Sequence, residues 1–381
     1  MARIEAQGLA DAPTRRPKRR EDYTLQPLDL VLRDGGAHAL LGAADSGAGR
    51  LFELLSGQRR PSHGQVLFDG RDVTALPPWA RNVALVSRRP AVYPAMTVAE
   101  NLAFPLRNRG VAAAAVRSRV DRIAELLLLA DELARPAGRL ADELRLRVAL
   151  GRALVVDDVA AVLLDDPLAA AEPARRPALR LLLRTVRRAL GRTWLLVTSD
   201  ADDALTFADE VAVLIGGRVV QVGTAAALFD EPVHAGVGRA IGRPGMNFLP
   251  VTAGDGEPCF AGRTLIEPAP AQLAAWLSAQ RAAVPNAGLT LGIRPEHLTL
   301  AEAGAPGAIA AELRQLQECG TTLLLSARIG SADVAARIAA DSPAALDLAA
   351  AAGRPQPASQ MLRLSLINRH TRFYRDEELL R

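Results

Sequence analysis

The stretch GAADSGAGRLFELLSG, residues 42–57, has the outline of a phosphate-binding loop that runs into a helix. Such a loop reads G-x-x-x-x-G-K-[ST] between a strand and a helix. Its glycines let backbone N–H groups approach the phosphates, its lysine reaches the terminal oxygens, and its hydroxyl holds Mg²⁺. When the motif starts at Gly42, its second glycine is Gly47, but Ala48 and Gly49 fall where the lysine and the hydroxyl belong.

A second register of this loop is possible. A start two residues later places Arg50 at the lysine position, but it supplies neither a first glycine nor a hydroxyl. Gly42 directly follows the apolar run AHALL, as a loop at the carboxyl end of a strand should, and this favours the first register. Arg50 is then the nearest cation, and its planar fork does not copy an ammonium group. Taken alone, the loop is explained equally well by a plain Gly/Ala turn.

The chain around the loop alternates short apolar runs with longer periodic segments from about residue 24 to 235. This pattern is typical of parallel strands joined by crossover helices. The expected strands are 37–41, 83–86, 160–164, 194–198 and 211–215. Helical spacing of apolar residues predicts helices over 116–134 and 179–190, the second ending at Gly191. We therefore expect an α/β domain over residues 24–240.

The composition and the hydrophobic pattern of the sequence change after Gly242. Pro244, Pro250 and a Gly/Asp/Pro cluster at 254–258 indicate a domain boundary. Short alternating segments follow at 322–329 and 361–367, with an alanine-rich interruption near 344–353, and they predict a small β-rich domain over residues 241–381.

The remaining residues, 1–23, are polar and basic, and we expect a solvated arm. Its run TRRPKRR, residues 14–20, could also bind phosphates or anionic lipid headgroups. The arm has no apolar segment of the kind that secretory signals contain, and the chain has no run of about 18 apolar residues. The net charge of +4 is mild, and we expect no nucleic-acid partner. Cys259 and Cys319 have no metal or redox spacing, so we expect free thiols.

Several segments taken together resemble the nucleotide-binding subunit of an ABC importer of the carbohydrate-uptake type. They are residues 66–110, 148–154 (VALGRAL), 162–169 (VLLDDPLA), 195–224 and 291–298 (LGIRPEHL). The resemblance covers nearly all of residues 24–300. It implies a P-loop ABC cassette followed by a small β-barrel-like regulatory domain of the OB type, with ATP and Mg²⁺ as cofactors. NLAFPLRNRG and PGMNFLP are similar to the branch that takes up glycerol or glycerol phosphate.

The resemblance also implies a place and partners for the chain. It predicts a peripheral location on the cytoplasmic face of the cell membrane. Residues 91–104 correspond to the segment that docks on the membrane-spanning permease subunits. Cassettes of this family work as dimers, in which each ATP lies between the loop of one subunit and the LSGGQ signature of the other.

The residues that the resemblance assigns to chemistry depart from the family pattern. The implied nucleotide-binding residues are Gly42, Ala43, Ala44, Asp45, Ser46, Gly47, Ala48, Gly49, Arg50 and, at the position of a Mg²⁺-linked glutamine, Arg88. Asp165 keeps the metal-side carboxylate, Asp166 stands where a catalytic glutamate belongs, and Ser199 occupies the switch-histidine position. The signature reads LADEL, residues 140–144.

These replacements weaken both binding and catalysis. Loss of the lysine removes a charge-assisted interaction of about 1.5–3 kcal/mol, so the affinity for ATP should fall by about one to two decades. Asp166 is one methylene shorter than glutamate, and Ser199 cannot donate as a charged imidazole does. Asp142 and Glu143 place carboxylates where the γ-phosphate of a partner would arrive.

Three functions remain open at this point. The first is a hydrolysis-deficient importer subunit for a small polyol or sugar-like solute that pairs with an intact second cassette. The second is an active ATPase that uses Arg50, Asp165 and Asp166 in a rearranged site. The third is a regulatory module that needs no nucleotide.

Several individual residues are open to two interpretations. Asp165 and Asp166 could be a strand-end pair or a Mg²⁺ site, and Arg88 could be solvated or contact an anion. Tyr23 could stack on adenine or pack as an ordinary aromatic. His297 in RPEHL is expected to be structural.

Overall fold

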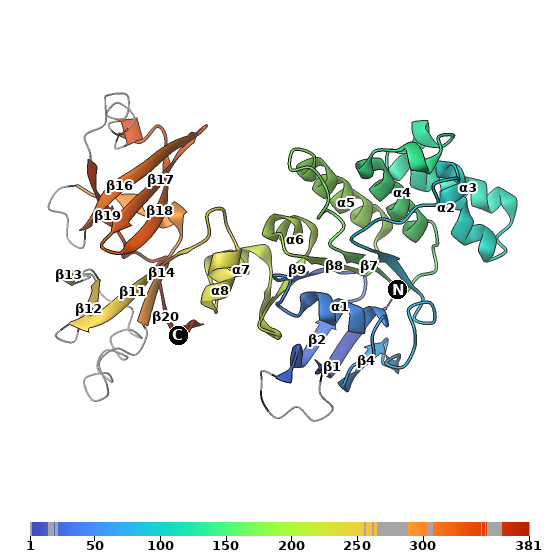
Figure 1. Ribbon diagram of the computed structural model, residues 1–381, viewed down its shortest axis with the longest axis horizontal. Helices are drawn as coiled ribbons and strands as arrows, with labels where there is room; N and C mark the ends of the chain where they lie inside the picture. Colours follow the sequence, from blue (N-terminus) through green and yellow to red (C-terminus); the bar gives the residue numbers. More distant parts are fainter. Residues whose placement is uncertain are drawn as a thin grey trace. The chain divides into compact units, whose positions relative to one another are not determined.

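The computed structural model of the chain describes residues 2–13, 19, 22–254, 257–260, 263–264, 289–302, 308–343, 345–346, 348 and 360–380. The chain separates into two compact units, Met1–Ala225 and Ala226–Arg381 (Figure 1). This division lies before the predicted boundary at residues 240/241, which stays a prediction. No helix among the described residues is long and apolar enough to cross a membrane.

The first unit is organised around a six-stranded sheet with the order β10-β9-β3-β8-β7-β6. Its strands are β3 (Ala37–Leu41), β6 (Val83–Val86), β7 (Ala161–Asp165), β8 (Trp194–Thr198), β9 (Glu210–Ile215) and β10 (Arg218–Gly223). All neighbours pair in parallel except β10, which runs antiparallel to β9. The five parallel strands are those predicted from the apolar runs, because strands buried on both faces are nearly continuous in hydrophobic residues.

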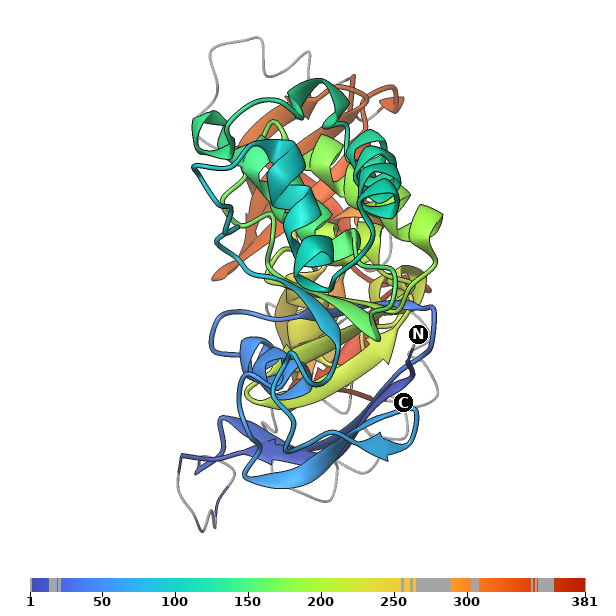
Figure 2. The ribbon, with the colours of Figure 1, turned by 90° about the vertical axis from the view of Figure 1, so that its right-hand side faces the viewer.

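A smaller antiparallel sheet completes the core of this unit, with the order β2-β1-β4-β5. Its strands are β1 (Ile4–Asp11), β2 (Leu25–Leu32), β4 (His63–Phe68) and β5 (Arg71–Asp72). Helix α1 (Ala48–Ser56) lies between the two sheets (Figures 1 and 2), and its buried residues pack with apolar residues from both.

The expectation of a solvated arm over residues 1–23 is wrong for Ile4–Asp11. This segment is β1, which pairs with β2 on one side and with β4 on the other. Ile4, Ala6 and Leu9 are buried, so hydrophobic burial and two ladders of hydrogen bonds hold the segment in place. Of the basic run, residues 14–18 and 20 lie outside the described part of the chain.

Helices α2 (Val98–Asn108), α3 (Ala113–Leu126) and α4 (Asp142–Leu154) form a group beside the large sheet (Figure 1), whereas α5 (Arg176–Leu190) and α6 (Ala201–Phe207) follow β7 and β8. The short 3₁₀ turns Ala130–Glu132 and Ala137–Arg139 connect α3 to α4. The predicted helix over 116–134 therefore ends early, and Leu128 has a φ of 56°, which breaks the helical path. The second predicted helix ends at Gly191, as expected, with a φ of 57°.

The second unit carries two antiparallel sheets that share one apolar core. Its elements are α7 (Ala225–Asp230), α8 (Ala235–Ala240), β11 (Asn247–Gly254), β12 (Glu257–Phe260), β13 (Arg263–Thr264), β14 (Leu289–Ile293), the 3₁₀ turn Pro295–His297, β15 (Thr299–Leu300), β16 (Ala308–Cys319), β17 (Thr322–Ile329), β18 (Ala332–Ala339), β19 (Gln360–Ser365), β20 (Arg372–Arg375) and β21 (Glu378–Leu379). The expected β-rich character is confirmed, and β17 coincides with a predicted strand. Most of the alanine-rich segment near 344–353 lies outside the described residues.

Candidate functional site

The predicted site residues come from the carboxyl ends of neighbouring parallel strands. In the sheet, β3, β8, β7 and β6 are adjacent in that order. The loop after β3, Ser199 after β8, the Asp165–Asp166 pair at the end of β7 and Arg88 after β6 therefore share one edge. Ligand sites of open α/β sheets lie at this edge, and the roles of these residues in binding stay predictions.

The loop keeps the shape of a phosphate-binding loop. The amide of Gly42 donates to the carbonyl of Thr198 at 3.2 Å, and Gly47 has a left-handed φ of 93° just before α1. A Cβ on Gly42 would lie 2.1 Å from Oγ of Ser46, so only glycine fits there. Ser46 is buried, and its Oγ accepts a hydrogen bond from the amide of Ala48 at 3.3 Å. The backbone geometry is thus held by contacts within the chain.

The side chains at the start of α1 do not supply the usual phosphate chemistry. Ala48 is 2% exposed and offers only a methyl group. A Cβ on Gly49 would meet nothing within 4 Å, so a hydroxyl residue has room there but is absent. Within the described residues, the amide of Gly49 has no protein acceptor, as is usual in the first turn of a helix. This end of α1 can still attract an anion through its backbone.

Arg50 is engaged away from the phosphate position. Its Nε lies 3.1 Å from Oδ2 of Asp11 on β1, and its Nη1 donates to Oε2 of Glu53 at 2.7 Å. Both carboxylates belong to the first unit, so the guanidinium ties α1 to the small sheet. A role for Arg50 in binding nucleotide stays a prediction, and it would require these pairs to break.

Asp166 is held in a strained and largely buried position. It is 5% exposed, and its φ of 42° is unusual for a residue other than glycine. Its Oδ1 accepts a hydrogen bond from Oγ1 of Thr198 at 3.2 Å, and Nη2 of Arg88 lies 3.4 Å from its Oδ2. Burial raises the pKa of the Asp166 carboxyl, and the charge of Arg88 and the Thr198 hydroxyl offset part of this rise. Asp166 therefore belongs to an internal ion pair.

Ser199 and Asp165 occupy less constrained positions. Ser199 is exposed directly after β8, and Asp165 is half-buried at the last position of β7. Asp200, the residue after Ser199, caps α6 by accepting a hydrogen bond from the amide of Asp203. The position predicted for a switch histidine thus carries a short, solvated hydroxyl, and its role stays a prediction.

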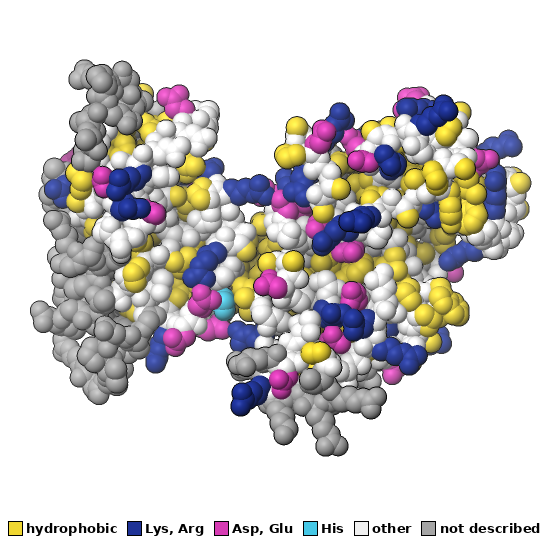
Figure 3. All heavy atoms as spheres, in the orientation of Figure 1, with side chains coloured by type: hydrophobic (Ala, Val, Ile, Leu, Met, Phe, Trp, Pro, Cys, Tyr) yellow, Lys and Arg dark blue, Asp and Glu magenta, His cyan; other side chains and the backbone are white. Residues whose placement is uncertain are grey.

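The LADEL segment opens α4, and its carboxylates are also paired within the chain. Glu143 pairs with Arg147 and with Nη1 of Arg175, the latter at 2.9 Å. Burial raises the pKa of Glu143, but the two guanidinium groups outweigh it and leave the pKa below its usual range. Figure 3 shows the same pattern more widely, because basic and acidic side chains lie close together over the visible face of the first unit.

The residues present fit a bound Mg²⁺ poorly. Asp165 offers one carboxylate, Gly49 offers no hydroxyl, and the position after β6 brings the cation of Arg88. A magnesium ion is usually held by oxygen ligands and demands near-octahedral geometry. No group of three or more His, Cys, Asp or Glu side chains suited to a metal occurs among the described residues. The loop amides fit phosphate better than the side chains fit the metal.

The backbone of segment 91–104 is held by a network of side-chain hydrogen bonds. Asn101 is fully buried on α2, where its Oδ1 accepts from the amide of Tyr93 at 2.8 Å. Its Nδ2 donates to the carbonyls of Tyr93, Met96 and Thr97. Thr97 caps α2 in a capping box with Glu100. These bonds fix the backbone before the helix and determine what it presents outward.

The outer side of this segment presents an aromatic cluster beside a cavity. The Tyr93 ring is 37% exposed, lies 4.7 Å from the Phe104 ring, and has the Arg152 guanidinium 4.4 Å from its centroid. A cavity of about 340 Å³ opens next to it and is lined in part by Pro90, Ala91 and Arg152. An exposed aromatic group next to a cavity is a typical anchor for a protein partner.

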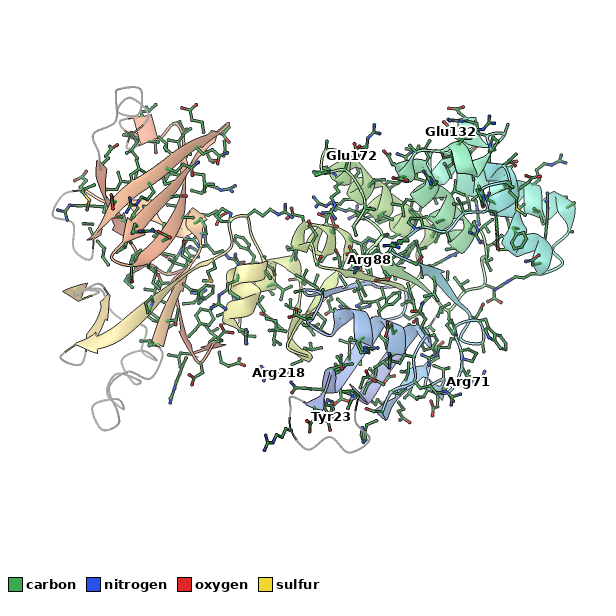
Figure 4. All side chains as sticks on the ribbon, viewed as in Figure 1. Tyr23, Arg71, Arg88, Glu132, Glu172 and Arg218 are labelled. Carbon is green, nitrogen blue, oxygen red and sulfur yellow. The ribbon has the colours of Figure 1, made fainter. Side chains whose placement is uncertain are left out.

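Sequence reasoning missed the two residues that organise these places. Thr198 and Asn101 carried no distinct motif, although the pattern Thr97-x-x-Glu100 is a capping-box signal for the start of α2. Of the uncertain residues, Tyr23 lies well away from Arg88 in Figure 4, and its role stays a prediction. His297 stacks on His370 with ring centroids 3.8 Å apart.

Comparison with known proteins gives matches over both parts of the chain. The family described as ABC transporter matches residues 25–169, and the family described as MalK OB fold domain matches residues 242–298. The sn-glycerol-3-phosphate import ATP-binding protein UgpC of Chromohalobacter salexigens is 39% identical over 289 residues, or 76% of this chain and 74% of the relative. The maltose/maltodextrin import ATP-binding protein MalK of Yersinia pestis is 34% identical over 295 residues, or 77% of this chain and 78% of the relative.

A solved structure shares the fold. It is cbiO1 from Clostridium perfringens, part of the ABC transporter complex cbiONQ, with a TM-score of 0.55 and 24% sequence identity. The match covers 60% of this chain and 90% of that one.

Proposed function

We propose that this chain, which belongs to the ABC transporter family, is an importer subunit that docks on a membrane-spanning permease. In this proposal the chain does not itself hydrolyse ATP. Family membership implies ATP and Mg²⁺ as the cofactors. The proposal concerns how this chain departs from that role: its affinity for Mg-ATP is weakened, and its own site does not cleave the nucleotide.

One observation carries the proposal. The loop keeps its backbone shape, while the charged side chains that a rearranged ATPase would need are paired with one another. Arg50 binds Asp11 and Glu53, and Asp166 pairs with Arg88. Because Thr198 and Arg88 engage both oxygens of Asp166, this carboxylate would have to leave its partners before it could activate a water molecule.

The docking part of the proposal rests on the segment 91–104. A segment whose backbone is fixed by a buried asparagine loses little conformational entropy on binding, so it is suited to a partner. The exposed Tyr93 ring and its neighbouring cavity offer an anchor for a helix or loop of the permease. We infer a peripheral location on the cytoplasmic face of the membrane from this docking.

The solute and the second cassette complete the proposal. The names of the relatives support a sugar or a polyol phosphate such as sn-glycerol 3-phosphate as the solute. An importer needs at least one site that hydrolyses ATP, so a chain without hydrolysis would pair with an intact cassette as a heterodimer.

Co-purification tests the docking directly. The full chain is co-expressed with an intact cassette and a tagged pair of permease subunits of a sugar or glycerol phosphate importer, and the amount retained on the tag is measured. Tyr93→Glu should reduce the affinity behind retention about thirtyfold or more, because hot-spot aromatic residues contribute about 2 kcal/mol or more.

The matched control is Trp79→Glu, which changes another exposed aromatic residue of the same unit outside the segment. Retention of this variant should equal that of the unaltered chain. Equal retention of both variants, or equal loss of both, would contradict docking through residues 91–104.

A further inference from the structure

The contact between Arg88 and Asp166 leaves part of the guanidinium free. Among the described residues, Asp166 is the one carboxylate paired with Arg88, with Nη2 of Arg88 at 3.4 Å from Oδ2 of Asp166. The Arg88 side chain is 58% exposed, although the carboxylate that it meets is buried. A guanidinium has five N–H donors in a rigid fork, so Arg88 can hold Asp166 and a second anion together.

The second anion has a defined place at the same sheet edge. Neighbouring strands lie about 4.8 Å apart, so the ends of β3 and β7, with β8 between them, are about 10 Å apart. A polyphosphate that begins at the amides of α1 extends along this edge toward Asp166 and Arg88. Without a cation there, its terminal phosphate would meet the carboxylates of Asp165 and Asp166 directly, and like charges repel.

Magnesium usually relieves this repulsion, but the described residues at this sheet edge offer it little beyond the carboxylate of Asp165. Gly49 provides no hydroxyl, and the fixed charge of Arg88 pairs with Asp166, the residue directly after the metal-side carboxylate of Asp165. A second cation at this point would be repelled by the guanidinium.

We propose that the Arg88 guanidinium takes the place of the divalent cation, so that this chain binds the polyphosphate of a nucleotide without Mg²⁺. Arg88 bridges Asp166 and the terminal phosphate, while the amides at the start of α1 hold the inner phosphates. The inference rests on the proposed function only in treating the loop as a phosphate site, because docking on a permease requires no nucleotide.

Calorimetry of the full chain with ATP tests the inference, once with excess MgCl₂ and once with excess EDTA. The dissociation constant should be the same in the two buffers within about twofold, whereas a Mg²⁺-dependent site binds far more weakly in EDTA. Arg88→Gln should weaken binding in EDTA by about threefold to thirtyfold, because a charge-assisted contact is lost from a partly exposed side chain.

The variant should also gain a dependence on Mg²⁺, since the competing cation is gone. Arg71→Gln is the matched control, because Arg71 is an exposed arginine on β5, well away from Arg88 in Figure 4, and its binding should not change in either buffer. Tighter binding of the unaltered chain with Mg²⁺, equal behaviour of Arg88→Gln and Arg71→Gln, or no binding of ATP in either buffer would each overturn the inference. None of these results affects co-purification with the permease, which tests the proposed function separately.

Discussion

The phosphate loop and the segment 91–104 use polar side chains in opposite ways. At the loop edge, Arg50, Arg88 and Asp166 have charged partners within the chain, while Ala48 and Gly49 offer no side-chain donor to a ligand. In the segment 91–104, the buried Asn101 forms hydrogen bonds with backbone groups on the inner side. The exposed side keeps an aromatic group and a cavity.

This difference separates the shape of a site from its chemistry. A loop can keep its geometry through glycines and backbone hydrogen bonds after its reactive side chains are gone, because those bonds do not depend on the ligand. A docking surface has no such division, since the backbone shape and the exposed side chains together are the binding site. The comparison therefore predicts that changes in the two regions have different consequences.

The largest effect is expected for Asn101→Ala. It would leave the amide of Tyr93 without its acceptor and remove the Nδ2 bonds to three carbonyls, which keep their backbone donors, at a cost of about 2–4 kcal/mol in the free energy of unfolding. Denaturant unfolding measures this cost. Asn108→Ala is the matched control, because Asn108 is exposed at the end of the same helix. Similar losses for the two variants would show that the network does not fix the segment.

A slightly smaller effect, a gain in the affinity for Mg-ATP, is expected when the missing lysine and hydroxyl are restored to the loop. Ala48→Lys with Gly49→Ser adds an ammonium group and a hydroxyl to a backbone that already has the required shape, and Gly49 has room for a side chain. The affinity for Mg-ATP should rise about tenfold to a hundredfold by calorimetry. Ala48→Met with Gly49→Ser controls for side-chain length without the charge. An unchanged affinity in the lysine variant would mean that the loop no longer accepts phosphates.

The smallest effect is expected for Arg50→Ala. Because Arg50 pairs with Asp11 and Glu53, its loss should lower the free energy of unfolding by about 0.5–1 kcal/mol and leave the affinity for ATP unchanged. Both quantities can be measured on one preparation. A tenfold loss of affinity would instead favour the rearranged ATPase in which Arg50 replaces the missing lysine.

The sequence allowed prediction where the physical signal was local. The parallel strands were found because strands covered on both faces are continuous apolar runs, and Gly191 was found because a helix often ends at a glycine. Strand β1 was missed because its buried alternation is interrupted at Gly8, where the pairing register shifts. The early end of α3 was missed because nothing in the sequence around Leu128 announces a positive φ.

The sequence supplied candidate positions for the site but not the contacts that their side chains make. The resemblance to the family identified Arg88 and Asp166 as candidates, because its motifs align with these positions of the sequence. Their ion pair depends on how side chains from two different strand ends turn in three dimensions, and no local pattern encodes that. The same holds for Asn101, whose partners are backbone atoms.

Phosphate release from purified full-length chain and Mg-ATP, compared with Asp166→Ala, tests the central claim most directly. We predict that both proteins release phosphate only at the rate of the buffer blank, because Asp166 is held by Arg88 and Thr198 and the loop has no lysine. Release well above the blank that disappears in Asp166→Ala would contradict this account and identify the chain as an active ATPase.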